Sequence, residues 1–330
     1  MLKAKLKLPQ EHLFATPTTV AFIALVASLM ALSFSPILIR VSEGELGPNA
    51  TIFNRFWIST VALMLWNGIT TTRRQLSHSE PKKSEIYTSR VILLLLGVGF
   101  VMFATLILWA WSLNQTSVAN STLMHNLAPL FTVLTGWLVW GKRFDSRFLL
   151  GMVVAIAGAC LLAYHDFSST TDQFQGDILA LLSASFLGLY PLIVEELRTQ
   201  LSPVVIMTWC SAIGTLLLLP IVLLTEDKVF PCSLGGWLTV ISLSLLCQIL
   251  GLGLYAYCLN RLSSGFVSLC DLFVPVLSTQ EAWFIFSEKP NIATLISFAI
   301  IGLGVYVTSS SQSAINTAID TAISTEVKSA

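Results

Sequence analysis

The chain has 330 residues, of which 55% are hydrophobic and only 11% are charged, and its mean hydropathy is +0.78. Soluble domains carry roughly a quarter charged residues, so this composition excludes an ordinary soluble protein. Eighteen basic and eighteen acidic residues give a net charge of zero, which provides no basis for nucleic-acid binding.

The apolar residues are gathered into ten blocks, and each is long enough to cross roughly 30 Å of hydrocarbon as a helix. The blocks lie at about 18–39, 49–70, 91–113, 117–140, 147–165, 176–195, 203–224, 235–258, 264–286 and 291–309. The first block follows a basic stretch, as in a signal peptide, but its apolar run is too long for one. We therefore predict a retained helix there and an all-α integral membrane protein with ten transmembrane helices.

The basic residues predict how the chain is oriented. With the amino terminus in the cytoplasm, fourteen of the eighteen Lys and Arg residues lie on the cytoplasmic side. Loops on that side are enriched in Lys and Arg. The sequence thus predicts a multi-pass protein of the plasma membrane with both termini cytoplasmic.

The two parts of the chain resemble each other. At a constant offset of 146, Trp109 matches Tyr255, Trp111 matches Tyr257 and Pro129 matches Pro275. At an offset of 155, Pro36 matches Pro191 and Ser28 matches Ser183. Matched prolines and tryptophans in the same order indicate an internal duplication, since each has a distinct backbone or interfacial role.

Each copy holds five predicted spans. An odd number of spans forces the second copy to insert upside down, which predicts two inverted five-helix repeats around a shared cavity, as in many secondary transporters. The predicted organisation is a cytoplasmic tail at 1–17, the first repeat at 18–165, the second at 176–309 and a disordered cytoplasmic tail at 310–330.

Several of these features together resemble the EamA family of the drug/metabolite transporter superfamily. They are the two five-helix halves, the segment NRFW in the second helix, and the paired segments that begin at Pro129 and Pro275. The resemblance implies a central cavity lined by helices 1, 3, 4, 6, 8 and 9, and transport of small metabolites such as amino acids, often outward. The family's usual Gly-Glu pair is replaced by Gly141-Lys142 and by Ser287-Glu288.

Two ionisable residues occupy equivalent positions in the fourth helix of each copy. Asp271 corresponds to His125 at the offset of 146, and each lies four residues before a matched proline. A charge inside a bilayer is costly and faces protein or water, so we expect both side chains to line the cavity. Helix-packing hydrogen bonds are the structural alternative. Either group could also carry a coupling proton.

Other candidates accompany these two. The expected substrate-binding residues besides Asp271 and His125 are Ser121, Thr122, Asn126, Ser268, Tyr190, Trp111 and Tyr257. The expected helix-bending or gating residues are Pro36, Pro129, Pro191 and Pro275. Arg55 is expected to make contacts at the interface or a helix end, and Glu281 to extend toward the interface.

These patterns predict a secondary transporter that moves a small, amino-acid-like metabolite by alternating access, and we expect export. A multidrug or lipophilic-cation efflux carrier is the alternative, while a membrane enzyme or a channel is less favoured. The six cysteines have no metal-ligand spacing, and no cofactor, metal site or catalytic residue is expected. The expected partners are the substrate and the lipid bilayer, and the sequence specifies no oligomeric state.

Overall fold

The computed structural model describes residues 17–76, 87–116, 118–164, 174–286 and 292–315. Over these ranges the chain is helical, and its only β-type contact is an isolated bridge between Leu262 and Ile315. Most of the predicted tails, at 1–16 and 316–330, and the Ser287-Glu288 pair lie outside the described residues.

The first half of the chain contains seven described helices. They are α1 (Pro17–Ser33), α2 (Ser35–Ser42), α3 (Pro48–Leu76), α4 (Ser89–Leu113), α5 (Val118–His125), α6 (Ala128–Trp140) and α7 (Ser146–Tyr164). Pro48 opens α3 because proline lacks the backbone N–H that a first helical turn leaves unbonded.

The second half contains the remaining helices. They are α8 (Phe174–Arg198), α9 (Pro203–Thr225), α10 (Leu234–Ser242), the π-helix η2 (Leu243–Gly251), α11 (Leu252–Cys258), α12 (Ser264–Cys270), α13 (Phe273–Phe286) and α14 (Ile292–Ser309), followed by the 3₁₀ turn η3 (Gln312–Ala314).

The described residues contain six helical runs that are long and apolar enough to cross a membrane. These runs are Thr18–Ser42, Ser89–Leu113, Ser121–Trp140, Phe174–Arg198, Pro203–Thr225 and Leu234–Cys258. The shorter apolar helices Ser146–Leu161 and Thr294–Ser309 lie beside them. A multi-pass membrane protein follows from this composition, while the count of ten spans stays a prediction.

Four predicted spans are not single regular helices. Breaks at Phe34, at 126–127 and at 271–272 divide three of them, and η2 interrupts the fourth. Pro36, Pro129 and Pro275 each lie in the first turn of the helix that follows a break, where a missing N–H is tolerated. In contrast, α8 continues unbroken through Pro191, so a helix bend or gate there stays a prediction.

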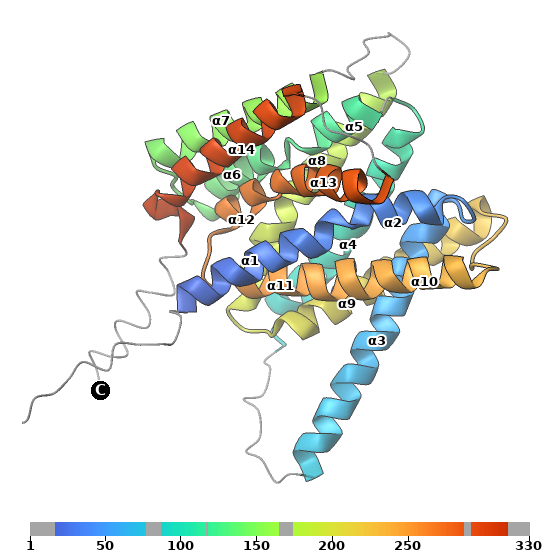
Figure 1. Cartoon of the computed structure of the whole chain (residues 1–330). Helices are drawn as coiled ribbons and strands as arrows, with labels where there is room; N and C mark the ends of the chain where they lie inside the picture. The colour runs from blue at the N-terminus through green and yellow to red at the C-terminus, as the bar shows by residue number, and fades with distance from the viewer. Residues whose placement is uncertain (1–16, 77–86, 117, 165–173, 287–291, 316–330) are drawn as a thin grey trace, which may run out of the picture.

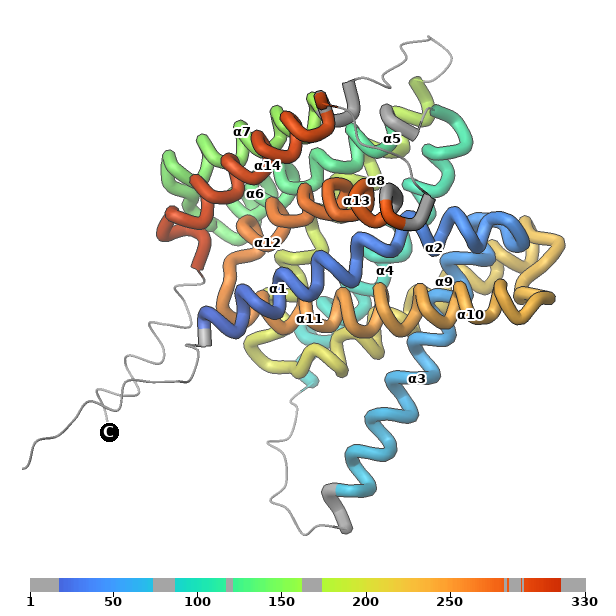
Figure 2. The backbone as a smooth tube through the Cα atoms, viewed as in Figure 1, coloured from blue at the N-terminus to red at the C-terminus, as the bar shows by residue number. Residues whose placement is uncertain are grey.

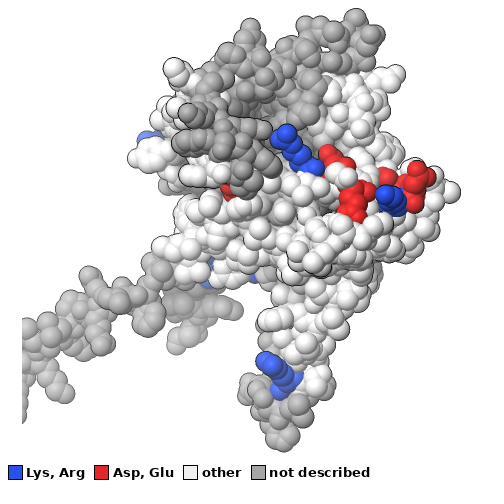
Figure 3. Space-filling model, turned by 45° about the vertical axis from the view of Figure 1, so that its right-hand side comes forward, with Lys and Arg blue, Asp and Glu red and all other residues white. Residues whose placement is uncertain are grey.

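The helices form one bundle (Figure 1). Figures 1 and 2 show α7 and α14 side by side along one face, α1 between α13 and α11, and α3 diverging from the others. The end where α1 begins and α14 finishes is here named the terminal end. The end where α2 finishes and α10 begins is the opposite end. Figure 3 shows charged side chains gathered near the opposite end and a broad uncharged surface beside them.

Close backbone contact joins α7 to α14. A Cβ atom on Gly158 would lie 2.8 Å from the backbone nitrogen of Ile301, and one on Gly304 would overlap the backbone nitrogen of Ala155. Ala155 and Gly158 match Ile301 and Gly304 at the offset of 146. The two contacts are therefore equivalent, and both depend on the absence of a side chain.

A pair of hydrogen bonds repeats in the same way. Ser28 on α1 donates to the Gly251 carbonyl at 2.8 Å, and Ser183 on α8 donates to the Thr105 carbonyl at 2.8 Å. The serines match at the offset of 155 and the carbonyls at 146. In each case the first long helix of one half bonds the third of the other half.

Two carboxylates at the opposite end satisfy the N–H groups at helix starts. Glu45 accepts hydrogen bonds from the Ser233 hydroxyl and from the backbone of Cys232 and Ser233, just before α10. Glu226 accepts from the Asn49 backbone at 3.0 Å in the first turn of α3. The bonds to Glu45, led by that from the Ser233 side chain, lower the pKa of its carboxyl.

Residues 310–315, at the start of the tail that the sequence predicts to be disordered, contact the helical bundle. Ser311 donates to the Asp145 carboxylate at 2.9 Å, and Ser263 donates to the Ser313 carbonyl at 2.6 Å. Ala314 is fully buried. This stretch has no apolar face, and hydrogen bonds from hydroxyl and backbone groups attach it to the bundle instead.

We expect Gly304→Ala to destabilise the protein. The added methyl group would overlap the α7 backbone, and overpacking of this kind costs about 1–3 kcal/mol. Thermal unfolding of purified protein in detergent should show a lowered Tm. Gly302→Ala is the control, because its Cβ would meet nothing nearer than 3.9 Å. Equal Tm values for the two variants would show that the α7–α14 contact is not close.

Candidate functional site

His125 ends α5 in a polar and aromatic setting. Its ring stacks on Trp109 of α4, with centroids 5.1 Å apart and planes inclined by 25°. Its Nδ1 lies 3.0 Å from the Ser183 hydroxyl, which donates its proton to the Thr105 carbonyl. A hydroxyl has one proton to donate, so Nδ1 of His125 must be the donor. A neutral His125 therefore keeps its Nε2 lone pair for another partner.

Asp271 lies in the break between α12 and α13. Its Oδ2 accepts a hydrogen bond of 3.0 Å from the Tyr255 hydroxyl on α11. Its Oδ1 is buried and has no hydrogen-bond partner among the described residues. Tyr190 of α8 packs close by, its ring centroid 6.0 Å from that of Tyr255. A buried acceptor of this kind is suited to a donor supplied by a ligand, by water or by a bound proton.

The two ionisable residues have equivalent partners. Trp109 packs on His125. Tyr255, which matches Trp109 at the offset of 146, donates a hydrogen bond to Asp271. Each half thus sets one aromatic residue of its third helical run against one ionisable residue of its fourth. The sequence contained this signal, because Trp109 and Tyr255 were matched with each other, although neither was among the predicted site residues.

Trp111 and Tyr257 do not join these pairs, and their contribution to a substrate site stays a prediction. Their exposed fractions are 41% and 43%, whereas Tyr255 is buried. Two residues along an α-helix correspond to a rotation of about 200°, which turns one side chain outward when the other points inward.

The remaining predicted polar residues connect helices. Ser121 of α5 lies 2.8 Å from the Ser112 hydroxyl of α4, and both are buried. Ser268 of α12 lies 3.0 Å from the Thr132 hydroxyl of α6, which also donates to the Gly188 carbonyl at 2.9 Å.

Thr122 and Asn126 are half-buried, on α5 and in the break that follows it. Tyr190 is buried, and its hydroxyl lies 3.9 Å from the Met207 sulfur.

A second polar cluster surrounds Arg55 of α3. Its Nε donates to Gln248 at 2.7 Å and its Nη1 donates to Ser35 at 3.2 Å. Glu281 of α13 accepts a 2.6 Å hydrogen bond from Ser33, and its other oxygen is buried without a partner among the described residues. Both side chains make their hydrogen bonds within the protein, and their predicted depth at the membrane interface stays a prediction. Gln248, isolated in an apolar run, was a signal that sequence reasoning missed.

At the terminal end, an ion pair connects the two halves. Lys142, just after α6, lies 2.6 Å from the Glu195 carboxylate of α8, and the two side chains are 23% and 11% exposed. Lys142 also donates to the Ser264 hydroxyl at 3.1 Å, and the Ser264 backbone donates to Glu195 at 2.8 Å. Lys142, which stands where the family usually has a glutamate, is therefore paired with Glu195.

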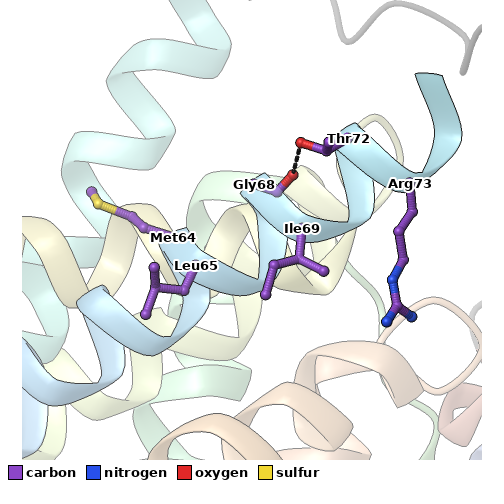
Figure 4. A pocket seen from close by; sticks show the side chains of 6 residues that line it. All are labelled: Met64, Leu65, Gly68, Ile69, Thr72 and Arg73. Carbon is purple, nitrogen blue, oxygen red and sulfur yellow. Dashed lines mark hydrogen bonds between the residues drawn. The ribbon is translucent and has the colours of Figure 1, made fainter. Parts of the chain in front are cut away.

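A groove of about 420 Å³ lies away from all of these residues, along α3 (Figure 4). It is lined by Met64, Leu65, Gly68, Ile69, Thr72 and Arg73. Its wall is mostly apolar and belongs to a single helix, which fits a surface that faces lipid better than a site for a polar ligand.

Comparison with known proteins identifies the family. The sequence model of the EamA-like transporter family matches residues 18–164 and again 174–310, so the chain belongs to this family. An uncharacterized transporter of Archaeoglobus fulgidus is 27% identical over 297 residues, which cover 88% of this chain and 96% of the relative.

Two relatives carry more specific names. The pseudopaline exporter CntI of Pseudomonas aeruginosa is 22% identical, over 64% of this chain and 72% of its own. A probable terminal-alkyne amino-acid exporter of Streptantibioticus cattleyicolor is 23% identical, over 81% and 86%. A protein crystal structure superposes with a TM-score of 0.73 at 19% identity, covering 88% of this chain and 97% of that one, and supports the fold alone.

We expect Lys142→Met to destabilise the protein, because Glu195 would keep a mostly buried charge without its cation. Breaking a fully buried pair costs about 3–5 kcal/mol, and partial exposure reduces this to about 1–3 kcal/mol. Thermal melting in detergent should show the loss, and the double variant with Glu195→Met should recover part of it. Arg143→Met, at an exposed neighbouring position, is the control. A Tm equal to that of the control would mean that the pair contributes nothing.

Proposed function

We propose that this protein is a secondary transporter that exports a small, amino-acid-like metabolite across the plasma membrane by alternating access. The observation that carries the proposal is the equivalence of the pairs Trp109–His125 and Tyr255–Asp271 within a transporter family. A polar, partly unsatisfied residue in each half is what a binding site between two repeats needs.

The proposed architecture is ten spans in two inverted five-helix repeats. It is supported by the two successive matches of the family model and by the repeated bonds from Ser28 and Ser183. Since α1 begins and α14 finishes at the same end of the bundle, the described helices suit an even number of spans. The excess of Lys and Arg favours the cytoplasm for that terminal end.

Alternating access is supported by a hydrogen bond that breaks the internal symmetry. Thr132 and Ser268 are 3.0 Å apart, near the terminal end, where α12 also packs against α6 and α8. Their equivalents at the offset of 146 are Ser278 and Thr122, and no hydrogen bond joins these two described residues. The bonded pair closes one end, so the protein is proposed to face outward here and to exchange the two pairs as it turns inward.

The substrate class is supported by the named relatives and by the chemistry of the site. One relative is named as an exporter of pseudopaline and another as a probable exporter of an amino acid. Asp271 is suited to a cationic group of the substrate or to a coupling proton, and His125 to a proton or a hydrogen-bond donor. A lipophilic-cation carrier would also use Asp271, so competition by such cations separates the two readings.

An enzyme or a channel fits these features less well. Family membership favours transport, and a channel would pass solutes without saturation, whereas a carrier saturates and shows counterflow. Purified protein in liposomes, loaded with unlabelled amino acids and other metabolites, should accumulate the labelled form of its substrate. If no compound in the panel gives saturable counterflow, the proposal fails.

We expect Asp271→Asn to reduce kcat/KM for the transported metabolite at least tenfold and to alter the dependence of transport on pH. Removing a buried charged partner costs about 2–5 kcal/mol in recognition, and an amide carries no proton across neutral pH. Asp227→Asn, in an exposed loop, is the control. Normal transport with an unchanged pH profile would remove Asp271 from both functions.

We expect cysteine pairs to report the two proposed states. In a chain with its native cysteines replaced, Thr132→Cys with Ser268→Cys should cross-link quickly without substrate, since the native oxygens are 3.0 Å apart. Thr122→Cys with Ser278→Cys should cross-link slowly in the outward-facing form and faster during turnover. Mobility on non-reducing gels measures both rates. Two pairs whose rates are equal and insensitive to substrate would contradict the exchange.

A further inference from the structure

The segment that follows α14 packs across the terminal end of the bundle. We name residues 310–315, which include η3, the C-terminal strap; it lies beside α12 (Figure 1). Ala314 is fully buried and Ser311 is 4% exposed, so the strap is packed against the helices. It makes hydrogen bonds with two loops, one before α7 and one before α12.

The strap holds the loop before α7 through Asp145. Ser311 donates to Oδ2 of Asp145 at 2.9 Å, and the Asp145 backbone donates to the Ser313 hydroxyl at 3.1 Å. Oδ1 of the same carboxylate accepts a 2.7 Å hydrogen bond from the Phe148 backbone in the first turn of α7. One aspartate therefore joins the strap to the start of α7.

The strap holds the loop before α12 through its backbone. The Ser263 hydroxyl donates to the Ser313 carbonyl at 2.6 Å, and the Ser263 backbone donates to the Ala314 carbonyl at 3.0 Å. Leu262 and Ile315 form the antiparallel bridge of the described chain. Ser263 is also the N-cap of α12. The strap is thus bonded to the residue that starts α12.

The start of α12 joins the two halves of the protein at this end. Ser264, which follows the cap, is bonded to both members of the Lys142–Glu195 ion pair. One helical turn further, Ser268 is bonded to Thr132 of α6. Opening of the terminal end requires α12 to move away from α6 and α8, and the strap is attached to the residue just before this contact.

The strap is not free to follow such a movement of α12. It continues from α14, which packs on α7 with close backbone contacts at Gly158 and Gly304. Its other attachment, Asp145, starts α7. The strap therefore ties α12 to the α7–α14 pair, and a movement of α12 away from that pair breaks the bonds at Ser263.

We propose that the C-terminal strap is a latch, and that the terminal end opens only when the strap releases the loop before α12. This inference rests on the proposed alternating access and adds a segment that controls the balance between its two states. The strap then favours the outward-facing form, because it supports the same contacts that close the terminal end.

The first test releases the strap in the full-length chain with its native cysteines replaced. Ala314→Arg places a long charged side chain at a fully buried position, which should displace the strap. Without substrate, cross-linking of Thr132→Cys with Ser268→Cys should then slow at least twofold. Gln312→Arg is the matched control, because it adds the same side chain at an exposed position of the strap and should leave the rate unchanged.

A milder variant decides if Ala314→Arg does not fold, as judged by gel filtration and Tm. Ser311→Ala combined with Ser313→Ala removes both hydroxyl groups that bond Asp145 and adds no bulk. It should slow the same cross-link in the same direction. A rate equal to that of Gln312→Arg overturns the latch.

The second test fixes the strap in place. Leu262→Cys with Ile315→Cys, in the cysteine-free background, sets two thiols at the antiparallel bridge, where the chains are close enough for a disulfide. Oxidation should slow counterflow in liposomes at least tenfold, and dithiothreitol should restore it. The labelled compound is the one that the parent chain exchanges fastest in the metabolite panel. The reduced protein is its own control, and Leu262→Cys alone reports any other effect of oxidation.

The outcomes separate the latch from the proposed function. Equal counterflow before and after oxidation, with the disulfide verified on non-reducing gels, overturns the latch while transport stands. If the parent chain gives no saturable counterflow for any compound in the panel, the proposed function fails. The cross-linking rates of Ala314→Arg and Gln312→Arg then still decide whether the strap holds the terminal end closed.

Discussion

The hydrocarbon interior of a bilayer offers no water, so each polar group there must bond within the protein, bind a ligand or remain unsatisfied at a cost of several kcal/mol. Most polar side chains of this bundle form hydrogen bonds within the protein. Ser28, Ser183 and Thr132 each donate to a carbonyl of another helix. Against this background, the unpartnered carboxylate oxygens of Asp271 and Glu281 are informative, although buried atoms of Asn49, Thr105 and Trp109 also lack a partner among the described residues.

The same constraint explains how the two halves fit together. Without a hydrophobic effect between helices, close packing and hydrogen bonds must supply the attraction. Gly158 and Gly304 provide the close approach, and the paired serines provide the bonds. Equivalent contacts of this kind would suit the two arrangements of similar energy that the proposed alternating access requires, and the Thr132–Ser268 bond would then distinguish the ends.

Sequence reasoning recovered the class of protein and its family, because apolar blocks and matched prolines are local signals. It also selected Asp271 and His125, since an ionisable residue within an apolar block is conspicuous. It did not select Trp109 and Tyr255, which contact His125 and Asp271, because the inward face of a helix depends on tertiary packing. The contacts of Arg55 with Gln248 and of Glu281 with Ser33 join helices that are far apart along the chain, and no local pattern encodes them. The position of the π-helix was not predicted either, because no pattern of composition marks a π-helix in the way that an apolar block marks a membrane span.

That π-helix also connects the two charged regions mechanically. Gln248 in η2 orients Arg55, and Tyr255, shortly beyond η2 in α11, bonds Asp271. A π-helical stretch is wound more loosely than an α-helix, so tightening it would rotate everything that follows relative to everything that precedes it. Such a rotation would turn Tyr255 relative to Gln248. A change in the orientation of Arg55 would then also change the hydrogen bond to Asp271.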